Sequence, residues 1–142
     1  RKAFHSGEEG KTRILVTHHP LFAMPIGEEG ALTKVVNRHD DALLAAADAG
    51  VHILLAGHFH RSFSKSARQM VENAGPALVV QAGTATSTRL RGDEKQSFNW
   101  IETRDNREID LQVVAWDGER FGPGSHARYR HDGENWHREA TG

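Results

Sequence analysis

Histidine is the residue type in this sequence with the clearest potential for chemistry. Two adjacent histidines, His18 and His19, precede a proline, and two more, His58 and His60, stand one residue apart after a glycine. Alternate residues of an extended chain face the same way, so we expect His58 and His60 to point at one spot. Imidazole rings that converge suit a divalent metal ion of the Zn, Mn or Fe type. The alternative is that these histidines are hydrogen-bonded turn residues.

The elements that must position these histidines can be inferred from the hydrophobic pattern. Apolar runs at 13–17 and 51–56 directly precede the two histidine groups, and each run predicts a strand. Between them, apolar residues recur at steps of three and four over 32–49, which predicts a helix capped by Gly50. A strand, a helix and a strand in this order predict a right-handed crossover between parallel strands. Their carboxyl ends then meet at one edge of the sheet, where open α/β sheets place their sites.

The remainder of the chain predicts a mixed α/β fold. A third strand is expected at 78–82, and alternating apolar and polar residues at 98–102 and 109–113 predict an antiparallel hairpin. Residues 21–33 are expected to form a loop after the first histidine group. The segment 61–75 is polar, and a short helical stretch is expected near its end.

The pattern divides the chain of 142 residues into three parts. We expect a polar N-terminal segment at 1–12, a domain at 13–121 and a C-terminal tail or hairpin at 122–142.

The composition excludes several classes of protein. The net charge is −1 and charged residues make up 26% of the chain, so we expect neither nucleic acid nor an anionic membrane as a partner. No apolar run approaches the roughly 20 residues of a membrane span. The chain has no cysteine, so any metal must be bound by histidine and oxygen ligands. We expect a cytoplasmic protein.

The order strand, His-His-Pro, helix, strand, Gly-His-x-His resembles the second half of the calcineurin-like metallophosphoesterases. The resemblance covers about residues 14–116, and the sequence Gly-Thr-Ala-Thr-Ser at 83–87 is most similar to the bacterial cyclic-nucleotide phosphodiesterase branch. It implies an α/β fold that is the C-terminal half of a two-sheet β-sandwich flanked by helices, with parallel and antiparallel strands.

The resemblance also implies a reaction and its ligands. Members of this family hold two divalent ions, here Mn, Fe or Zn, and a hydroxide between the ions attacks a phosphodiester or phosphomonoester. By motif position, His18 and His58 would bind one ion and His60 the other, which makes His58 and His60 the catalytic residues. The substrate would be a small phosphoester or a nucleotide.

Three further residues follow from the same resemblance. His19 either orients a neighbouring ligand or packs against the loop that follows it. Arg61 and Arg89 are candidates for contact with substrate phosphate, and the alternatives are a solvated side chain and a plain surface loop.

The motifs that the family carries in its first half are absent from this sequence. These are Asp-x-His, Gly-Asp and Gly-Asn-His, and the only Gly-Asp, at 92–93, lies after the histidines. We therefore expect a piece of a longer protein that is inactive alone. Its exposed sheet would recruit the missing half or a second copy of the chain. The alternative function is a non-catalytic fragment or degenerate relative that acts as an interaction domain.

Overall fold

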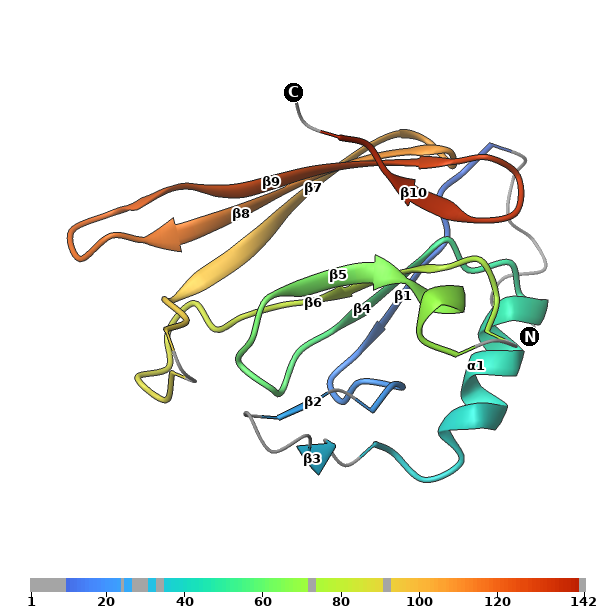
Figure 1. The fold of residues 1–142 in the computed structure, drawn as a ribbon, viewed down its shortest axis with the longest axis horizontal. Coiled ribbons are helices and arrows are strands. Elements are labelled where there is room, and N and C mark those ends of the chain that lie inside the picture. The colour runs from blue at the N-terminus through green and yellow to red at the C-terminus, as the bar shows by residue number, and fades with distance from the viewer. Residues whose placement is uncertain are drawn as a thin grey trace.

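The structure is a computed structural model, and it describes residues 10–23, 25–26, 31–32, 35–71, 74–90 and 93–140. Two four-stranded sheets lie in separate layers (Figure 1). The first contains, in spatial order, β1 (Ile14–Thr17), β4 (Ile53–Ala56), β6 (Leu78–Gln81) and β5 (Phe63–Ser66). The second contains β10 (Trp136–Arg138), β9 (Phe121–His131), β8 (Glu108–Trp116) and β7 (Ser97–Asp105). The remaining elements are the pair β2 (Pro25–Ile26) and β3 (Ala31–Leu32), the helix α1 (His39–Asp48) and the 3₁₀ turn η1 (Ala67–Gln69).

The predicted parallel arrangement of the first sheet is confirmed. Strand β1 pairs with β4 in parallel, with Ile14 opposite Ile53. Strand β4 pairs in parallel with β6, the predicted third strand. The predicted hairpin is also present, because β7 and β8 pair antiparallel with Ile101 opposite Leu111. The fold is therefore α/β, with one mixed and one antiparallel sheet.

The first sheet is apolar on both faces, so it is the middle layer of the molecule. Alternation along β4 sends Ile53 into the core between the two sheets, whereas Leu54 packs into the core under α1. Ile109 and Tyr129 of the second sheet close the inter-sheet core. Leu43 of α1 closes the other core, which lies between the helix and the first sheet. This double coverage explains why β6 is buried at every position.

The helix begins later than the sequence predicts. We expected it at 32–49, but Leu32 belongs to β3 and α1 begins at His39. Arg38, which precedes the helix, has a left-handed backbone with φ of 59°, so the chain cannot enter the helix before this turn. The apolar spacing upstream of Arg38 was misleading because Leu32 lies in β3, while Val35 and Val36 belong to no helix or strand. The predicted end of the helix agrees within two residues.

Three short strands were not predicted. The expected loop at 21–33 contains β2 and β3, which pair antiparallel. The polar segment after His60 contains β5, which pairs antiparallel with β6 at the sheet edge. An edge strand faces solvent on part of its surface, so its residues need not be apolar, and this polarity hid β5 in the sequence.

Residues 122–140, predicted to form a tail or hairpin, supply most of β9 and all of β10. Strand β9 crosses the boundary that we drew at residue 121 and pairs along most of its length with β8. Trp136 of β10 is almost fully buried in the inter-sheet core. The last strands are thus an integral part of the second sheet. Within the described part of the chain, no helix has the length and apolar character that crossing a bilayer requires.

A candidate metal centre of three histidines

The carboxyl ends of the parallel strands lie in one row. The paired residues run from Thr17 of β1 to Ala56 of β4, then Gln81 of β6, and finally Phe63 of β5. His18 directly follows the first of these residues in the chain. The two histidine groups therefore leave the sheet at the same edge, as the sequence predicts for parallel strands.

Buried residues hold the first histidine group in place. Pro20, Leu21 and Phe22 follow it and are all buried, with Leu21 and Phe22 in the core under α1. The hydroxyl of Thr17 donates a hydrogen bond to the carbonyl oxygen of His19 at 2.8 Å. The backbone is thus fixed on both sides of the two histidines, while their side chains remain exposed.

The second histidine group lies in a tight turn and not in an extended strand. His58 and His60 have left-handed φ angles of 76° and 55°. The N–H of Gly57 donates to the carbonyl oxygen of His18 at 3.2 Å, and Phe59 is buried. Our expectation that strand alternation aims His58 and His60 at one spot is wrong. Strand β4 ends at Ala56, and alternation does not apply in a turn with positive φ.

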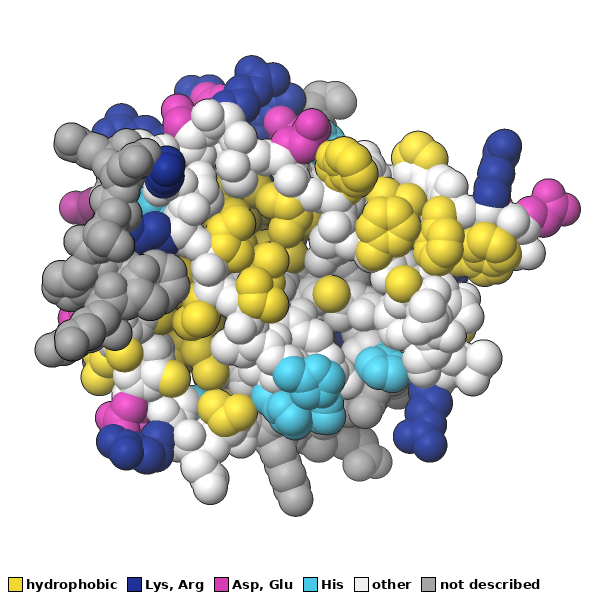
Figure 2. Space-filling view, turned by 180° about the vertical axis from the view of Figure 1, so that it is seen from behind, with side chains coloured by type: hydrophobic (Ala, Val, Ile, Leu, Met, Phe, Trp, Pro, Cys, Tyr) yellow, Lys and Arg dark blue, Asp and Glu magenta, His cyan; other side chains and the backbone are white. Residues whose placement is uncertain are grey.

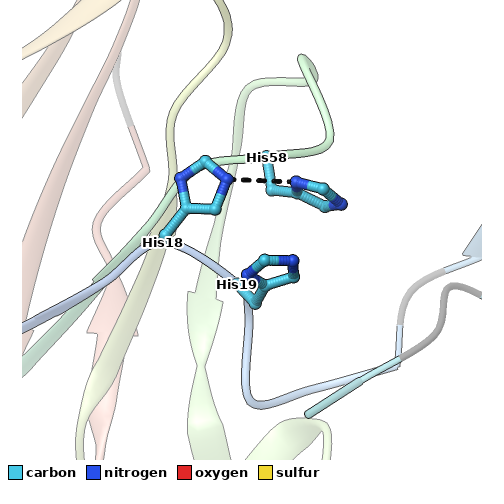
Figure 3. A group of neighbouring side chains, drawn as sticks. All are labelled: His18, His19 and His58. Atoms are coloured by element: carbon cyan, nitrogen blue, oxygen red, sulfur yellow. Dashed lines mark hydrogen bonds between the residues drawn. The ribbon is translucent and has the colours of Figure 1, made fainter.

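The turn brings His58 against His18 and His19 (Figure 3). The candidate ligand nitrogens of the three residues all lie within 4.8 Å of one another. Nδ1 of His58 lies 3.2 Å from Nε2 of His18, and the ring centroids of His19 and His58 are 4.1 Å apart. Two imidazole nitrogens that bind the same tetrahedral ion, each at about 2.0–2.1 Å, lie about 3.3 Å from each other. The cluster is therefore compact enough to share one ion.

The cluster is open to solvent. All three side chains are exposed, and histidine side chains gather at the lower edge of the face seen in Figure 2, with hydrophobic side chains above them. A solvent-facing group of three nitrogen ligands leaves further coordination positions for water or substrate. Such an open arrangement is typical of catalytic metal sites and not of closed structural ones.

His60 lies outside this cluster. Its Nδ1 is 2.8 Å from the carbonyl oxygen of Arg89. Because a carbonyl oxygen only accepts, Nδ1 carries the proton, and in the neutral ring the lone pair is on Nε2. Histidine ligands of metals commonly donate their other N–H in this way. The structure thus brings together His18 and His58 of the predicted ligand set and separates His60 from them.

The two arginines predicted to contact substrate lie near the second histidine group. Arg61 follows His60 directly, and its Nε lies 3.9 Å from a carboxylate oxygen of Glu94. Arg89 contributes its carbonyl oxygen to His60, and its side chain is exposed. Both roles stay predictions.

Sequence reasoning left the place of His19 open, and it missed a second residue, Gln81. His19 joins the cluster because the strand ends at Thr17, so adjacent side chains no longer point to opposite faces. Gln81 is fully buried at the end of β6 and bonds to the turn that carries His58. A signal existed for Gln81, because a glutamine that closes a run of apolar strand residues needs a polar partner.

Comparison with known proteins gives only a partial likeness in shape. No protein-family model matches the chain, and no curated protein matches it. Two solved structures of Vps29 from Entamoeba histolytica are similar, a wild-type form complexed with Zn²⁺ and a single mutant. The first is 19% identical with a TM-score of 0.45, and the match covers 66% of this chain and 48% of that one. The second is 19% identical with a TM-score of 0.42, and it covers 69% and 49%. The chain thus spans about half the length of these structures, and TM-scores below 0.5 carry no weight for function.

Proposed function

We propose that His18, His19 and His58 bind a divalent metal ion, and that the protein to which they belong hydrolyses phosphoester bonds. The observation that carries the proposal is the convergence of three imidazoles, with all ligand atoms within 4.8 Å, at the carboxyl edge of parallel strands. Two independent segments supply these rings, and buried residues fix the first of them. Zn²⁺, Mn²⁺ and Fe²⁺ all accept imidazole ligands in open sites.

The residues have separate roles in this proposal. His18, His19 and His58 hold the first ion. His60 presents the free Nε2 of a neutral ring, and we assign it to a second ion. Arg61, next to His60, supplies a cation for a substrate oxygen. When bound, the ions polarise a phosphoryl oxygen and lower the pKa of water.

The substrate class follows from the same assignment. Imidazole ligands leave the positive charge of the ions uncompensated within the cluster, and the described ligands include no carboxylate. An anionic substrate therefore gains from binding there. We propose a small phosphoester, either a phosphodiester such as a cyclic nucleotide or a phosphomonoester.

A metal titration with a phosphodiester assay tests the function. Zn²⁺ and Mn²⁺ are titrated into the chain by calorimetry, and hydrolysis of bis(p-nitrophenyl) phosphate is followed with each ion. We expect this chain to bind one ion and to show no turnover, because the described ligands include no carboxylate that could bridge the first ion to a second one at His60. If the natural protein carries carboxylate ligands in a preceding segment, we expect turnover when that segment is included. Absence of metal binding, or full activity of the short chain, would contradict the proposal.

The second candidate function is an interaction domain without catalysis. Exposed apolar side chains on edge strands favour it, since Val16 on β1 is 70% exposed and Trp100 on β7 is 58% exposed. In that case the variant His58→Ala retains the binding of any partner. A metal-dependent partner interaction that His58→Ala removes would contradict this second candidate.

A further inference from the structure

Gln81 is an unusual residue for its position. It ends β6, a strand that is buried at all four residues, and its own side chain is 0% exposed. Its Nε2 donates a hydrogen bond to the carbonyl oxygen of Gly57, the residue before His58. Its Oε1 is buried and has no hydrogen-bond partner among the described residues. A buried side-chain amide that has only one of its two polar groups hydrogen-bonded lowers the stability of the fold. We therefore expect the contact of Gln81 with Gly57 to have a role other than stability.

The turn that Gln81 contacts needs support. His58 and His60 both have left-handed φ angles, which are uncommon for residues other than glycine. Such conformations are strained and persist only where the surroundings determine them. The carbonyl oxygen of Gly57 immediately precedes this turn, so a donor on that oxygen fixes the peptide plane from which His58 projects.

The other end of the turn is tied to the same residue. The side-chain amide of Asn99 donates to the carbonyl oxygen of Gln81 at 3.3 Å. The hydroxyl of Ser62, which lies two residues after His60, donates to Oδ1 of Asn99 at 3.5 Å. Both ends of the turn are thus linked to the end of β6, one through the side chain of Gln81 and one through its backbone.

From these contacts we infer that Gln81 is the positioning residue of the metal centre: its amide holds the turn in the conformation that brings His58 against His18 and His19. The consequence for metal binding rests on the proposed function, but the consequence for ring geometry does not. Without the donor, the carbonyl oxygen of Gly57 loses its side-chain partner, and His58 leaves the cluster.

The test replaces Gln81 by a residue of similar size without a donor. Gln81→Met fills the same space, and Gln112→Met is the matched control, because Nε2 of Gln112 also donates to backbone carbonyls, those of Gly124 and Ser125 in the second sheet. The first readout is metal-free. Nuclear Overhauser contacts between the ring protons of His19 and His58 are expected in the wild type and the control, and are expected to be absent in Gln81→Met.

The second readout is the affinity for Zn²⁺, which we expect to fall about 10–100-fold in Gln81→Met and to stay unchanged in Gln112→Met. If Gln81→Met does not fold, Gln81→Leu gives the same test, because its apolar side chain is shorter and cannot donate to the Gly57 oxygen. Ring contacts that persist in the folded Gln81 variant, or that are missing in the wild type, overturn the inference. Ring contacts with no metal binding in the wild type overturn the proposed function and leave the positioning role standing.

Discussion

Nδ1 of His58 lies 3.2 Å from Nε2 of His18, although 40 positions separate the two residues in the chain. At this distance one ring donates an N–H hydrogen bond to the other in the absence of metal. An ion that takes both lone pairs replaces this hydrogen bond, and the hydrogen of the donor ring then lies on its other nitrogen. The contact exists because two parallel strands end in the same row of the sheet.

The variant His58→Ala is predicted to lose metal binding. It removes one of three nitrogen ligands, so we expect the affinity for Zn²⁺ to fall by at least about a hundredfold, measured by calorimetry. The control is His126→Ala, because His126 pairs with Asp110 on the second sheet and belongs to no cluster of ligands among the described residues. Equal loss in both variants would mean that the ion binds elsewhere.

Gly75→Ala is predicted to destabilise the packing of α1. A Cβ atom at Gly75 would lie 2.5 Å from Cβ of Ala47 and 2.8 Å from its Cα, and the helix backbone cannot move aside freely. We expect a loss of about 1–3 kcal/mol in the free energy of unfolding, measured by urea denaturation. Gly122→Ala is the control, because a Cβ there meets no atom within 4 Å. Similar stability of both variants would show that α1 does not pack as described.

The sequence predicts the central part of the fold well for a physical reason. The residues around Leu54 and Val79 must be apolar because they are covered on both sides, and this makes the parallel strands visible as continuous apolar runs. The edge strand β5 has no such constraint. The start of α1 depends on the left-handed backbone of Arg38, which an arginine does not signal.

The candidate site could be predicted only as far as strand direction determines it. The apolar runs place His18 and His58 at one edge, and the structure agrees. The positions of His19 and His60 depend on turn geometry. The left-handed φ of 55° at His60 directs that residue to the carbonyl oxygen of Arg89, and nothing in the residue types reveals it. The role of His60 at a second ion stays a prediction.

The stability of the protein is predicted to fall as the pH drops below about 6.5. Burial, with Arg13 and His131 nearby, holds the pKa of His52 below its ordinary value of 6.5. Burial also lowers the pKa of His131, although Asp132 acts in the opposite direction. Well above pH 6.5 neither the folded nor the unfolded state is protonated at these residues. Below it the unfolded state binds more protons than the folded state, so acid favours unfolding until the lowered pKa is passed.

This dependence can be measured on one variant. Nδ1 of His52 accepts a hydrogen bond from the backbone N–H of Arg13 at 2.9 Å, and the side-chain oxygen of an asparagine can take its place. His52→Asn therefore keeps the acceptor and removes the titration. Urea denaturation between pH 8 and pH 5.5 should show a smaller loss of stability in His52→Asn than in the wild type. An unchanged pH dependence would exclude His52 as a cause.

The open edge of the first sheet is predicted to drive self-association. Among the described strands, β1 has a neighbour on one side only, which is β4, and Ile14 and Val16 are 41% and 70% exposed. Their register partners on β4, Ile53 and Leu55, face the inter-sheet core. Ile14 and Val16 therefore extend the apolar inner face of the sheet to its edge, where this face is exposed to solvent. An edge strand with an apolar face favours pairing with a further strand.

Sedimentation velocity over a range of protein concentrations tests this last prediction. We expect the wild type to form a dimer or larger species as the concentration rises, and Val16→Lys to remain a monomer, because a charge on this face opposes pairing. Leu44→Lys is the matched control, since Leu44 is an exposed apolar residue on α1, away from the sheet edge. If the wild type is a monomer throughout, or if Leu44→Lys prevents association as well as Val16→Lys does, the edge of β1 is not the interface.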